Sequence, residues 1–331
     1  MPVPAADPLR MVKKIMREIG GYIELDTYHL PLLHERAVAL NCGRNALAYL
    51  LKARKIGSLL IPKFICDSVT GVCEREGVPY RFYSVGTDLL PAEPLEPKEE
   101  EWVLFVNYYS QFDNATIAEI VKRYQRVIVD QTHSYFQEPI PGVDTIYTCR
   151  KYFGVADGAF LYTDAASESS YPVDESFDRM NFLLGRYERT ASEFYPEYAA
   201  NNEYFRTQPI KQMSKLTRNL LHAIDYEKVK AVREENFRQL HEAFAEVNQL
   251  KLKGEPGTFM YPLMLEGGGK IRKRLQEKKI YIPTLWPDVF GWCGEEETEY
   301  QLARDILPLP IDQRYGREDM DYMIGMIREM I

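Results

Sequence analysis

Two residues near the middle of the chain could together hold one cofactor. Asp130 ends the apolar run 127–129, and Lys151 follows the segment 144–148, just ahead of a turn that contains Gly154. A lysine amine forms a Schiff base with an aldehyde, and a carboxylate keeps a pyridine nitrogen protonated so that the ring acts as an electron sink. Pyridoxal 5′-phosphate (PLP) needs both groups, so Asp130 and Lys151 are the candidate catalytic residues.

Taken alone, Asp130 could be an ordinary turn residue after a strand, and Lys151 could be a solvated surface lysine. The segment 41–46 shifts the balance, because Gly43 opens a predicted helix where backbone N–H groups can meet a phosphate. Thr148 could donate its hydroxyl to the same phosphate or cap its strand. In this order along the chain, the combination favours PLP.

The loop after Asp130 adds two candidate cofactor contacts. Thr132 is expected against the face of the ring. His133 comes within reach of the phenolic oxygen if the loop curls under the ring, whereas a lone histidine is otherwise more often structural.

The elements that position these residues alternate along the first half of the chain. Strands are predicted at 58–61, 80–85, 102–106, 127–129, 144–148 and 158–163, and helices at 44–55, 66–76 and 116–124. Nearly continuous apolar strands separated by helices indicate an α/β fold, with a mainly parallel central sheet and helices on both faces. Ligands bind beyond the carboxyl ends of such strands, where Asn107, Asp130 and Thr148 lie.

The second half of the chain has a different pattern, which indicates a smaller C-terminal α+β domain. Helices are predicted at 181–189, 210–224, 226–248, 270–279 and 317–330, and a strand at 258–265, with Pro262 at a sheet edge. We expect an N-terminal segment, 1–35, whose helix at 8–17 packs with the small domain. A large PLP-binding domain would span 36–225 and the small domain 226–331.

Composition limits the class of protein. The 331 residues are 45% hydrophobic and 27% charged, as in soluble globular proteins, and the net charge of −8 gives no general attraction to nucleic acid or anionic membranes. No apolar run reaches the roughly 18 residues of a membrane span, and no signal-peptide core begins the chain. The 5 cysteines form no C-x-x-C pair, so neither disulfides nor a metal site is expected. These features predict a cytoplasmic protein.

Other patterns are set aside. Gly267 to Lys270 resembles the end of a phosphate loop, but Ile271 replaces the required Ser or Thr, which indicates an ordinary loop. The acidic runs 98–101 and 295–299 are expected on solvated faces.

Four segments carry a resemblance to a known family. They are Gly43–Leu47, Leu60–Pro62, Val129–His133 and Arg150–Gly158. The sequence resembles the DegT/DnrJ/EryC1/StrS aminotransferases from about residue 21 to the segment 307–311. The resemblance implies PLP-dependent transferase fold type I, a homodimer, and a role in sugar biosynthesis with glutamate as amino donor. It also implies Lys151 as the Schiff-base lysine, Asp130 as the pyridine partner, and Gly43, Arg44 and Asn45 as the phosphate cradle.

The chain departs from the family at several of these positions. Arg44 and Asn45 stand where many members have Thr-Ala, so a phosphate hydroxyl is missing and Asn45 must substitute. His133 replaces a common glutamine. The family aromatic that stacks on the ring is replaced by Cys66, and Phe64 could take over from two residues away.

A second group of departures concerns the loop after residues 102–106. Asn107 stands at the family histidine and Ser110 at the glycine. Together the departures leave PLP binding in place but make a nucleotide-linked keto sugar less certain as the substrate.

The leading hypothesis is a homodimeric PLP-dependent aminotransferase that acts on a small-molecule amino donor and keto acceptor. The tyrosine-rich region 182–205 is expected to close the pocket of the neighbouring chain, or else to cover its own sheet. Its candidate residues are Arg186, Tyr187, Arg189, Tyr195 and Tyr198. Two rivals remain: a PLP-dependent sugar dehydratase, whose relatives carry histidine at the position of Lys151, and a catalytically silent homologue that acts as a binding or scaffold subunit.

Overall fold

A central sheet organises the larger part of the molecule. The structure, a computed structural model, describes residues 19–254 and 256–331, so the helix expected at 8–17 lies outside the described residues. The strands of the sheet are β1 (Val38–Leu40), β2 (Ser58–Pro62), β3 (Tyr80–Tyr83), β4 (Glu101–Val106), β5 (Val127–Asp130), β6 (Asp144–Thr148) and β7 (Ala159–Tyr162). Their order is β1-β7-β6-β5-β4-β2-β3. The pairs from β3 to β6 are parallel, and β7 pairs antiparallel with β1 and β6, which confirms the mainly parallel sheet.

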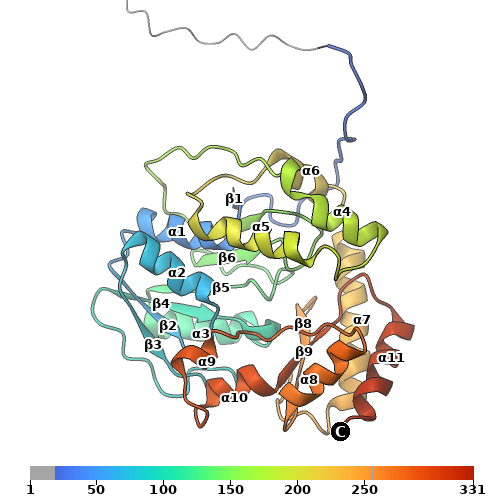
Figure 1. Ribbon diagram of the computed structural model, residues 1–331. Helices are drawn as coiled ribbons and strands as arrows, with labels where there is room; N and C mark the ends of the chain where they lie inside the picture. Colours follow the sequence, from blue (N-terminus) through green and yellow to red (C-terminus); the bar gives the residue numbers. More distant parts are fainter. Residues whose placement is uncertain (1–18, 255) are drawn as a thin grey trace, which may run out of the picture.

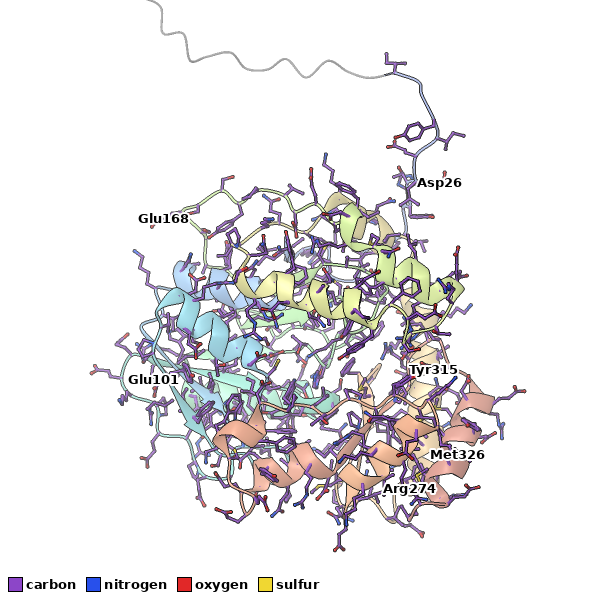
Figure 2. All side chains as sticks on the ribbon, in the orientation of Figure 1. Asp26, Glu101, Glu168, Arg274, Tyr315 and Met326 are labelled. Atoms are coloured by element: carbon purple, nitrogen blue, oxygen red, sulfur yellow. The ribbon has the colours of Figure 1, made fainter. Side chains whose placement is uncertain are left out.

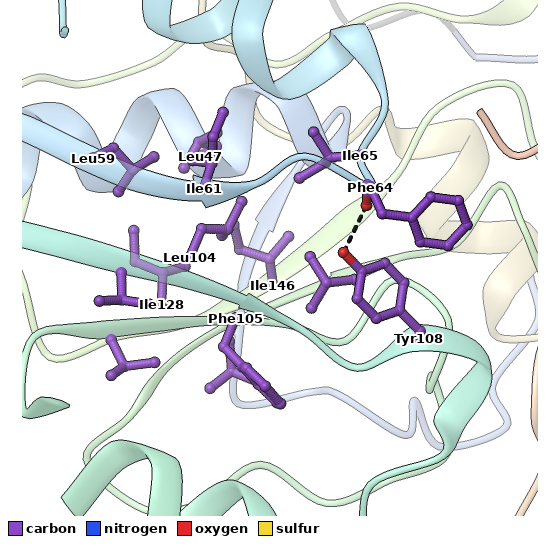
Figure 3. Close-up of a cluster of buried hydrophobic side chains, with 14 of the residues drawn as sticks. Leu47, Leu59, Ile61, Phe64, Ile65, Leu104, Phe105, Tyr108, Ile128 and Ile146 are labelled. Carbon is purple, nitrogen blue, oxygen red and sulfur yellow. Dashed lines mark hydrogen bonds between the residues drawn. The ribbon is translucent and has the colours of Figure 1, made fainter. Parts of the chain in front are cut away.

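Helices cover the sheet from both sides (Figure 1). They are α1 (Gly43–Ala53), α2 (Asp67–Glu76), α3 (Asn114–Tyr124), α4 (Asn181–Glu188), α5 (Tyr195–Thr207) and α6 (Lys215–Leu221). The β2–α2–β3 and β4–α3–β5 connections run in opposite directions along the sheet, so right-handed crossovers place α2 and α3 on opposite faces. Beneath α1, Leu47 packs with Leu104, Ile128 and Ile146 of the central strands in one buried cluster (Figure 3).

The C-terminal part forms a second, smaller core. It consists of α7 (Tyr226–Phe244), β8 (Met260–Met264), α8 (Gly268–Glu277), α9 (Val289–Trp292), α10 (Thr298–Asp305), β9 (Ile306–Pro310) and α11 (Arg317–Arg328). β8 and β9 form a two-stranded antiparallel sheet in which Pro262 lies opposite Pro308. Both strands are edges, so the missing proline N–H groups are tolerated. The glycine run that resembled a phosphate loop instead begins α8, where a Cβ on Gly268 would lie 2.1 Å from the Asp305 carbonyl oxygen.

The helix predicted at 210–224 is shorter than expected. Ser214 caps α6, because its side chain accepts a hydrogen bond from the Thr217 N–H and both its N–H and its hydroxyl donate to the buried Asp157 carboxylate. The residues before it are extended beside β1, with Met213 N–H donating to the Ala39 carbonyl. The strand β1 itself was not predicted.

Two glutamates of the acidic runs are buried, so the expectation of solvated faces is wrong for them. Glu101 is 3% exposed and is paired with Arg81. Glu299 is 2% exposed and accepts a hydrogen bond of 2.7 Å from the Val85 N–H. Glu101 is labelled at the sheet margin in Figure 2. Each carboxylate therefore ties together segments that are distant in sequence.

The described part of the N-terminal segment runs along α6. The Asp26 carbonyl, on the chain that rises from the body in Figure 2, accepts a bond from the Asn219 side chain. The Leu30 N–H donates to the His222 carbonyl at 2.9 Å. Among residues 19–254 and 256–331, no helix has the length and apolar character needed to cross a membrane.

Candidate active site

Three strands bring the predicted site residues to one edge of the sheet. In the parallel register Val106 lies opposite Asp130, and Asp130 lies opposite Ile146. Asp130 therefore ends β5 beside the ends of β4 and β6. Asn107 directly follows β4, and Thr148 is the last residue of β6. This edge is where α/β folds bind ligands.

Lys151, Thr132 and Asp130 form one connected group. The Lys151 Nζ donates a 3.0 Å hydrogen bond to the Thr132 hydroxyl. The Thr132 N–H in turn donates a 2.8 Å bond to a carboxylate oxygen of Asp130. The structure thus unites the two candidate catalytic residues through the threonine expected at the ring face.

The surroundings of Lys151 favour its neutral amine. Burial lowers the pKa of Lys151, and the negative charge of Asp130 opposes this shift, while Arg44 and Arg150 reinforce it. The Nζ atom also lies 5.6 Å from the centre of the Phe259 ring. A neutral amine is the form that acts as a nucleophile or accepts a proton.

The start of α1 is electropositive and open. Cys42 precedes the helix in an extended conformation without a side-chain cap, and nothing lies within 4 Å of the place where Gly43 would carry a Cβ. Arg44 and Arg150 both act electrostatically on the Cys42 thiol. In the part of the chain that the structure describes, neither arginine pairs with a carboxylate. Free N–H groups and two cations suit a phosphate dianion.

Of these two cations, Arg150 gives the stronger evidence for a phosphate site. Its guanidinium stacks on Phe205 at 4.9 Å and donates to the Asn202 side chain. Its Nε is buried and has no hydrogen-bond partner within the described ranges, and burial lowers the pKa of Arg150. A guanidinium with a buried, unsatisfied N–H and no carboxylate partner is unfavourable unless another anion compensates it, so the residues present fit a bound phosphate.

Asn45 does not supply the group that replaces the missing hydroxyl. Its side-chain amide donates to the Asn41 side chain and to the Pro209 carbonyl, each at 2.8 Å. Its oxygen accepts a 3.1 Å bond from Arg75, and its N–H donates to the Cys42 carbonyl. With these groups engaged inside the protein, Arg150 is better placed to hold the phosphate.

The candidates Phe64 and Cys66 lie in different surroundings. Phe64 is fully buried, with its ring centre 5.3 Å from that of Tyr108 and 5.0 Å from that of Trp286; Figure 3 shows the bond from the Tyr108 hydroxyl to its carbonyl. Cys66 caps α2, is half-buried, and its thiol responds to the charge of Lys151. Cys66 is therefore close enough to Lys151 for the lysine charge to act on its thiol.

Asn107 has a structural role in the described molecule. Its side-chain nitrogen donates to the Phe112 carbonyl and to the side chains of Gln131 and Gln137. Its oxygen accepts a bond from the Phe112 N–H. The residue organises the loops after β4 and β5 and has little capacity left for a cofactor.

His133 is enclosed by aromatic rings close to Lys151. Phe259 and Trp286 stack on it, at 4.9 and 5.6 Å. The Tyr109 N–H donates to its Nδ1 at 3.3 Å, whereas its Nε2 is buried and finds no partner in the described chain. Burial, reinforced by the charge of Lys151, lowers the pKa of His133 well below its usual value. The site thus holds a neutral imidazole with one unused nitrogen.

Several of these residues were missed from the sequence. Arg150 lies inside the motif around Lys151, and an arginine next to a candidate Schiff-base lysine was a usable signal. Phe259 and Trp286 come from segments after β6 that carry no motif. Their stacking on His133 depends on the packing of the small core against the sheet, which no local pattern reveals.

Comparisons with known proteins identify the fold. No protein-family model matches the sequence, and no curated protein does. Among solved structures, DesV from S. venezuelae is 15% identical with a TM-score of 0.62, over 89% of this chain and 84% of DesV. A DegT DnrJ EryC1 StrS aminotransferase from Brucella abortus is 16% identical with a TM-score of 0.58, over 89% and 85%. NtdA from Bacillus subtilis, solved with bound cofactor PMP, is 12% identical with a TM-score of 0.62, over 88% and 72%.

These likenesses extend over most of the chain and establish a shared fold. The expectation of PLP-transferase fold type I, with a mainly parallel sheet and a smaller C-terminal part, is confirmed. The resemblance to the DegT/DnrJ/EryC1/StrS aminotransferases is confirmed at the level of the fold.

The depressed pKa of Lys151 predicts a pH-dependent stability effect in cofactor-free protein. Folding disfavours the ammonium form, so below the folded pKa Lys151 lowers the free energy of unfolding by its full amount. The penalty fades as pH rises through that pKa, and it disappears near the unfolded value of 10.5. Lys151→Met should therefore be more stable than wild type at pH 7, with a gain that shrinks toward pH 10.5.

Denaturant unfolding across this pH range measures the difference, with Lys122→Met on the exposed side of α3 as a control that removes a solvated lysine. A Lys151→Met protein less stable than wild type at pH 7 would contradict the prediction, because the bond to Thr132 would then outweigh the burial penalty.

Proposed function

We propose that this chain is a PLP-dependent aminotransferase that moves an amino group from an amino acid to a keto substrate. The carrying observation is the connected group Lys151, Thr132 and Asp130 at the sheet edge, beside the unpaired cations at the start of α1. Solved structures of the same fold include sugar aminotransferases and proteins with PLP or PMP bound, which supports the cofactor and the reaction class. Glutamate as donor and a keto sugar, free or linked to a nucleotide, as acceptor are the proposed substrates.

Different residues would hold different parts of the cofactor. Asp130 would face the pyridine nitrogen and Thr132 a face of the ring. The N–H groups of Gly43 and Arg44, with the Arg150 guanidinium, would hold the phosphate. When bound, PLP supplies an aldehyde that condenses with amines and a ring that accepts the negative charge left on the substrate carbon.

Lys151 performs the proton transfer in this proposal. Burial lowers the pKa of Lys151, which favours the neutral form of its amine. In that form the amine could take a proton from the substrate carbon and deliver it to the cofactor. The Thr132 hydroxyl holds the Nζ at 3.0 Å before reaction and gives it a resting position. Asp130 would remain beside the pyridine nitrogen throughout, held by its bond from the Thr132 N–H.

We also propose that the substrates are small molecules and that a second copy of the chain completes the site. On α4 and α5, Leu184, Tyr187 and Tyr195 are 62%, 93% and 64% exposed. Tyr187 and Tyr195 therefore do not cover the sheet of their own chain, which was the alternative interpretation of this region. This exposed aromatic surface includes part of α5, the helix that also carries Asn202 and Phe205, the two contacts of Arg150. It therefore supports a homodimer whose interface borders the phosphate end of the site.

Purified protein mixed with PLP should become yellow and show a visible band that free PLP and apoprotein lack. Borohydride should fix the cofactor to Lys151, and Lys151→Ala should abolish this attachment. Absorbance and mass spectrometry measure both. Wild type without a protein-bound chromophore at excess PLP would rule out the enzyme proposal. A chromophore without turnover on any amino acid would instead favour the catalytically silent homologue.

Asp130→Asn should slow half-transamination by at least about 10²-fold while weakening PLP binding less, because asparagine can hydrogen-bond but cannot hold the pyridine proton by charge. Single-turnover absorbance with glutamate measures the rate. Asp113→Asn, the same change at the N-cap of α3, is the matched control. Near-normal turnover in Asp130→Asn would assign the partner role to another residue.

The active unit should be a homodimer whose sites need both chains. Mixing inactive Lys151→Ala chains with chains mutated at Arg186 or Tyr187 should restore activity, up to about a quarter of the wild-type level if each mixed dimer regains one site and mixing is random. Light scattering first establishes association. A fully active monomer would refute the shared site, and absence of rescue in verified mixed dimers would place Arg186 and Tyr187 in their own chain's site or outside any site.

A further inference from the structure

A buried turn beside His133 has an unusual backbone. Tyr109 and Ser110, which follow β4, have φ values of 52° and 55°. Both are fully buried. This left-handed region is sparsely populated by residues other than glycine, and two consecutive examples persist only where the surroundings hold them in place.

The surroundings hold this turn from both sides. On the large-sheet side, the Ser110 hydroxyl donates to the His133 carbonyl. On the C-terminal side, the Thr258 hydroxyl donates to the Tyr109 carbonyl. Within the loop itself, the Gln111 side chain donates to the same carbonyl at 2.9 Å. Fixed in this way, the turn directs the Tyr109 N–H at the His133 imidazole, 3.3 Å from Nδ1.

This N–H decides the protonation state of the imidazole. A backbone N–H can only donate, so Nδ1 must accept and cannot carry a proton itself. That requirement excludes the Nδ1–H tautomer and the doubly protonated ring, and leaves the proton on Nε2. Rotation of the ring is restricted as well, because Phe259 and Trp286 stack on it.

The resulting Nε2–H group is a donor without an acceptor. It is buried and has no partner among residues 19–254 and 256–331, and Lys151 lies close enough to influence the ring electrostatically. A buried N–H without an acceptor is unfavourable by itself. The arrangement becomes favourable when a ligand places an oxygen there.

We propose that the left-handed turn Tyr109–Ser110 locks His133 as the neutral Nε2–H tautomer and so makes it an obligate donor to the phenolic oxygen of the cofactor. The inference rests on the proposed function for the identity of that oxygen. Tyr109 and Ser110 are positioning residues, since they act through His133. The lock is a property of the protein before any cofactor binds, so it can be measured separately.

The decisive measurement is long-range ¹H–¹⁵N NMR of cofactor-free protein labelled in its 5 histidines. The spectrum of His133→Gln identifies the signals of His133 by their loss. Wild type should show the Nε2–H tautomer of His133, unchanged between about pH 5.5 and 8.5, across the range in which an ordinary histidine titrates. An Nδ1–H tautomer or an imidazolium would overturn the lock, even in a protein that binds PLP.

Two turn variants test the cause. Ser110→Gly loses the bond to the His133 carbonyl, but it fits the left-handed region and keeps the Tyr109 N–H. Thr258 and Gln111 still hold the Tyr109 carbonyl, so the tautomer should persist. Tyr109→Val places a β-branched residue where it is strongly disfavoured, and a second tautomer should appear in any folded protein. Retention of a single Nε2–H tautomer in folded Tyr109→Val would show that the turn is not its cause, and loss of the tautomer in folded Ser110→Gly would also contradict the mechanism.

PLP and its 3-deoxy analogue, which lacks the phenolic oxygen, identify the acceptor. PLP should move the Nε2–H proton signal downfield and the analogue should not. His133→Leu should weaken PLP binding about 10- to 100-fold, as expected for one lost hydrogen bond to a charged oxygen, and His133→Gln, which keeps a donor, should weaken it less. Equal shifts with both compounds would overturn the acceptor assignment. Failure of wild type to bind either compound would refute the proposed function. The tautomer of His133 would still be decided by the NMR measurement on cofactor-free protein.

Discussion

The register between β4, β5 and β6 is the constraint on which the rest of the site depends. Side chains alternate between the two faces of a strand, so a slip of one residue in β5 would turn Asp130 to the opposite face. The carboxylate would then lose the Thr132 N–H, and the link to Lys151 would disappear. Buried apolar residues on both faces of these strands fix this register, which is why a large core supports a site of a few polar atoms.

The sequence predicted those helices and strands whose bounds depend on their own residues, and it failed where a distant residue decides the structure. The strand predicted at 127–129 lies within the observed β5, Val127–Asp130, because an uninterrupted apolar run has one stable setting in a covered parallel sheet. The start of α6 was misplaced because its cap, Ser214, is held by Asp157, 57 residues earlier in the chain. Likewise, the burial of Glu101 depends on Arg81 in the neighbouring region of the sheet, and charge composition alone does not reveal such a partner.

The candidate site divides in the same way between local and distant contributions. Asp130, Thr132 and Lys151 lie in short motifs, so their chemistry could be inferred from residue type and order. The engagement of Asn45 and Asn107 in internal hydrogen bonds depends on segments up to 164 residues away. Polar residues in a loop beside a ligand site can serve the loop or the ligand, and only their three-dimensional neighbours distinguish the two.

The network around Asn45 also limits how this protein can change. Its amide satisfies Asn41, Arg75 and the Pro209 carbonyl at once, so the alanine that many members of the resembled family have at position 45 would leave groups of three segments without their partner. Each such loss is unfavourable by about 1–3 kcal/mol, comparable to a large part of the margin by which a protein is stable. The chain is thus separated from the more common phosphate cradle by an epistatic barrier: a route between the two must pass through compensating changes at positions 41 and 75 before the residue at 45 can be exchanged.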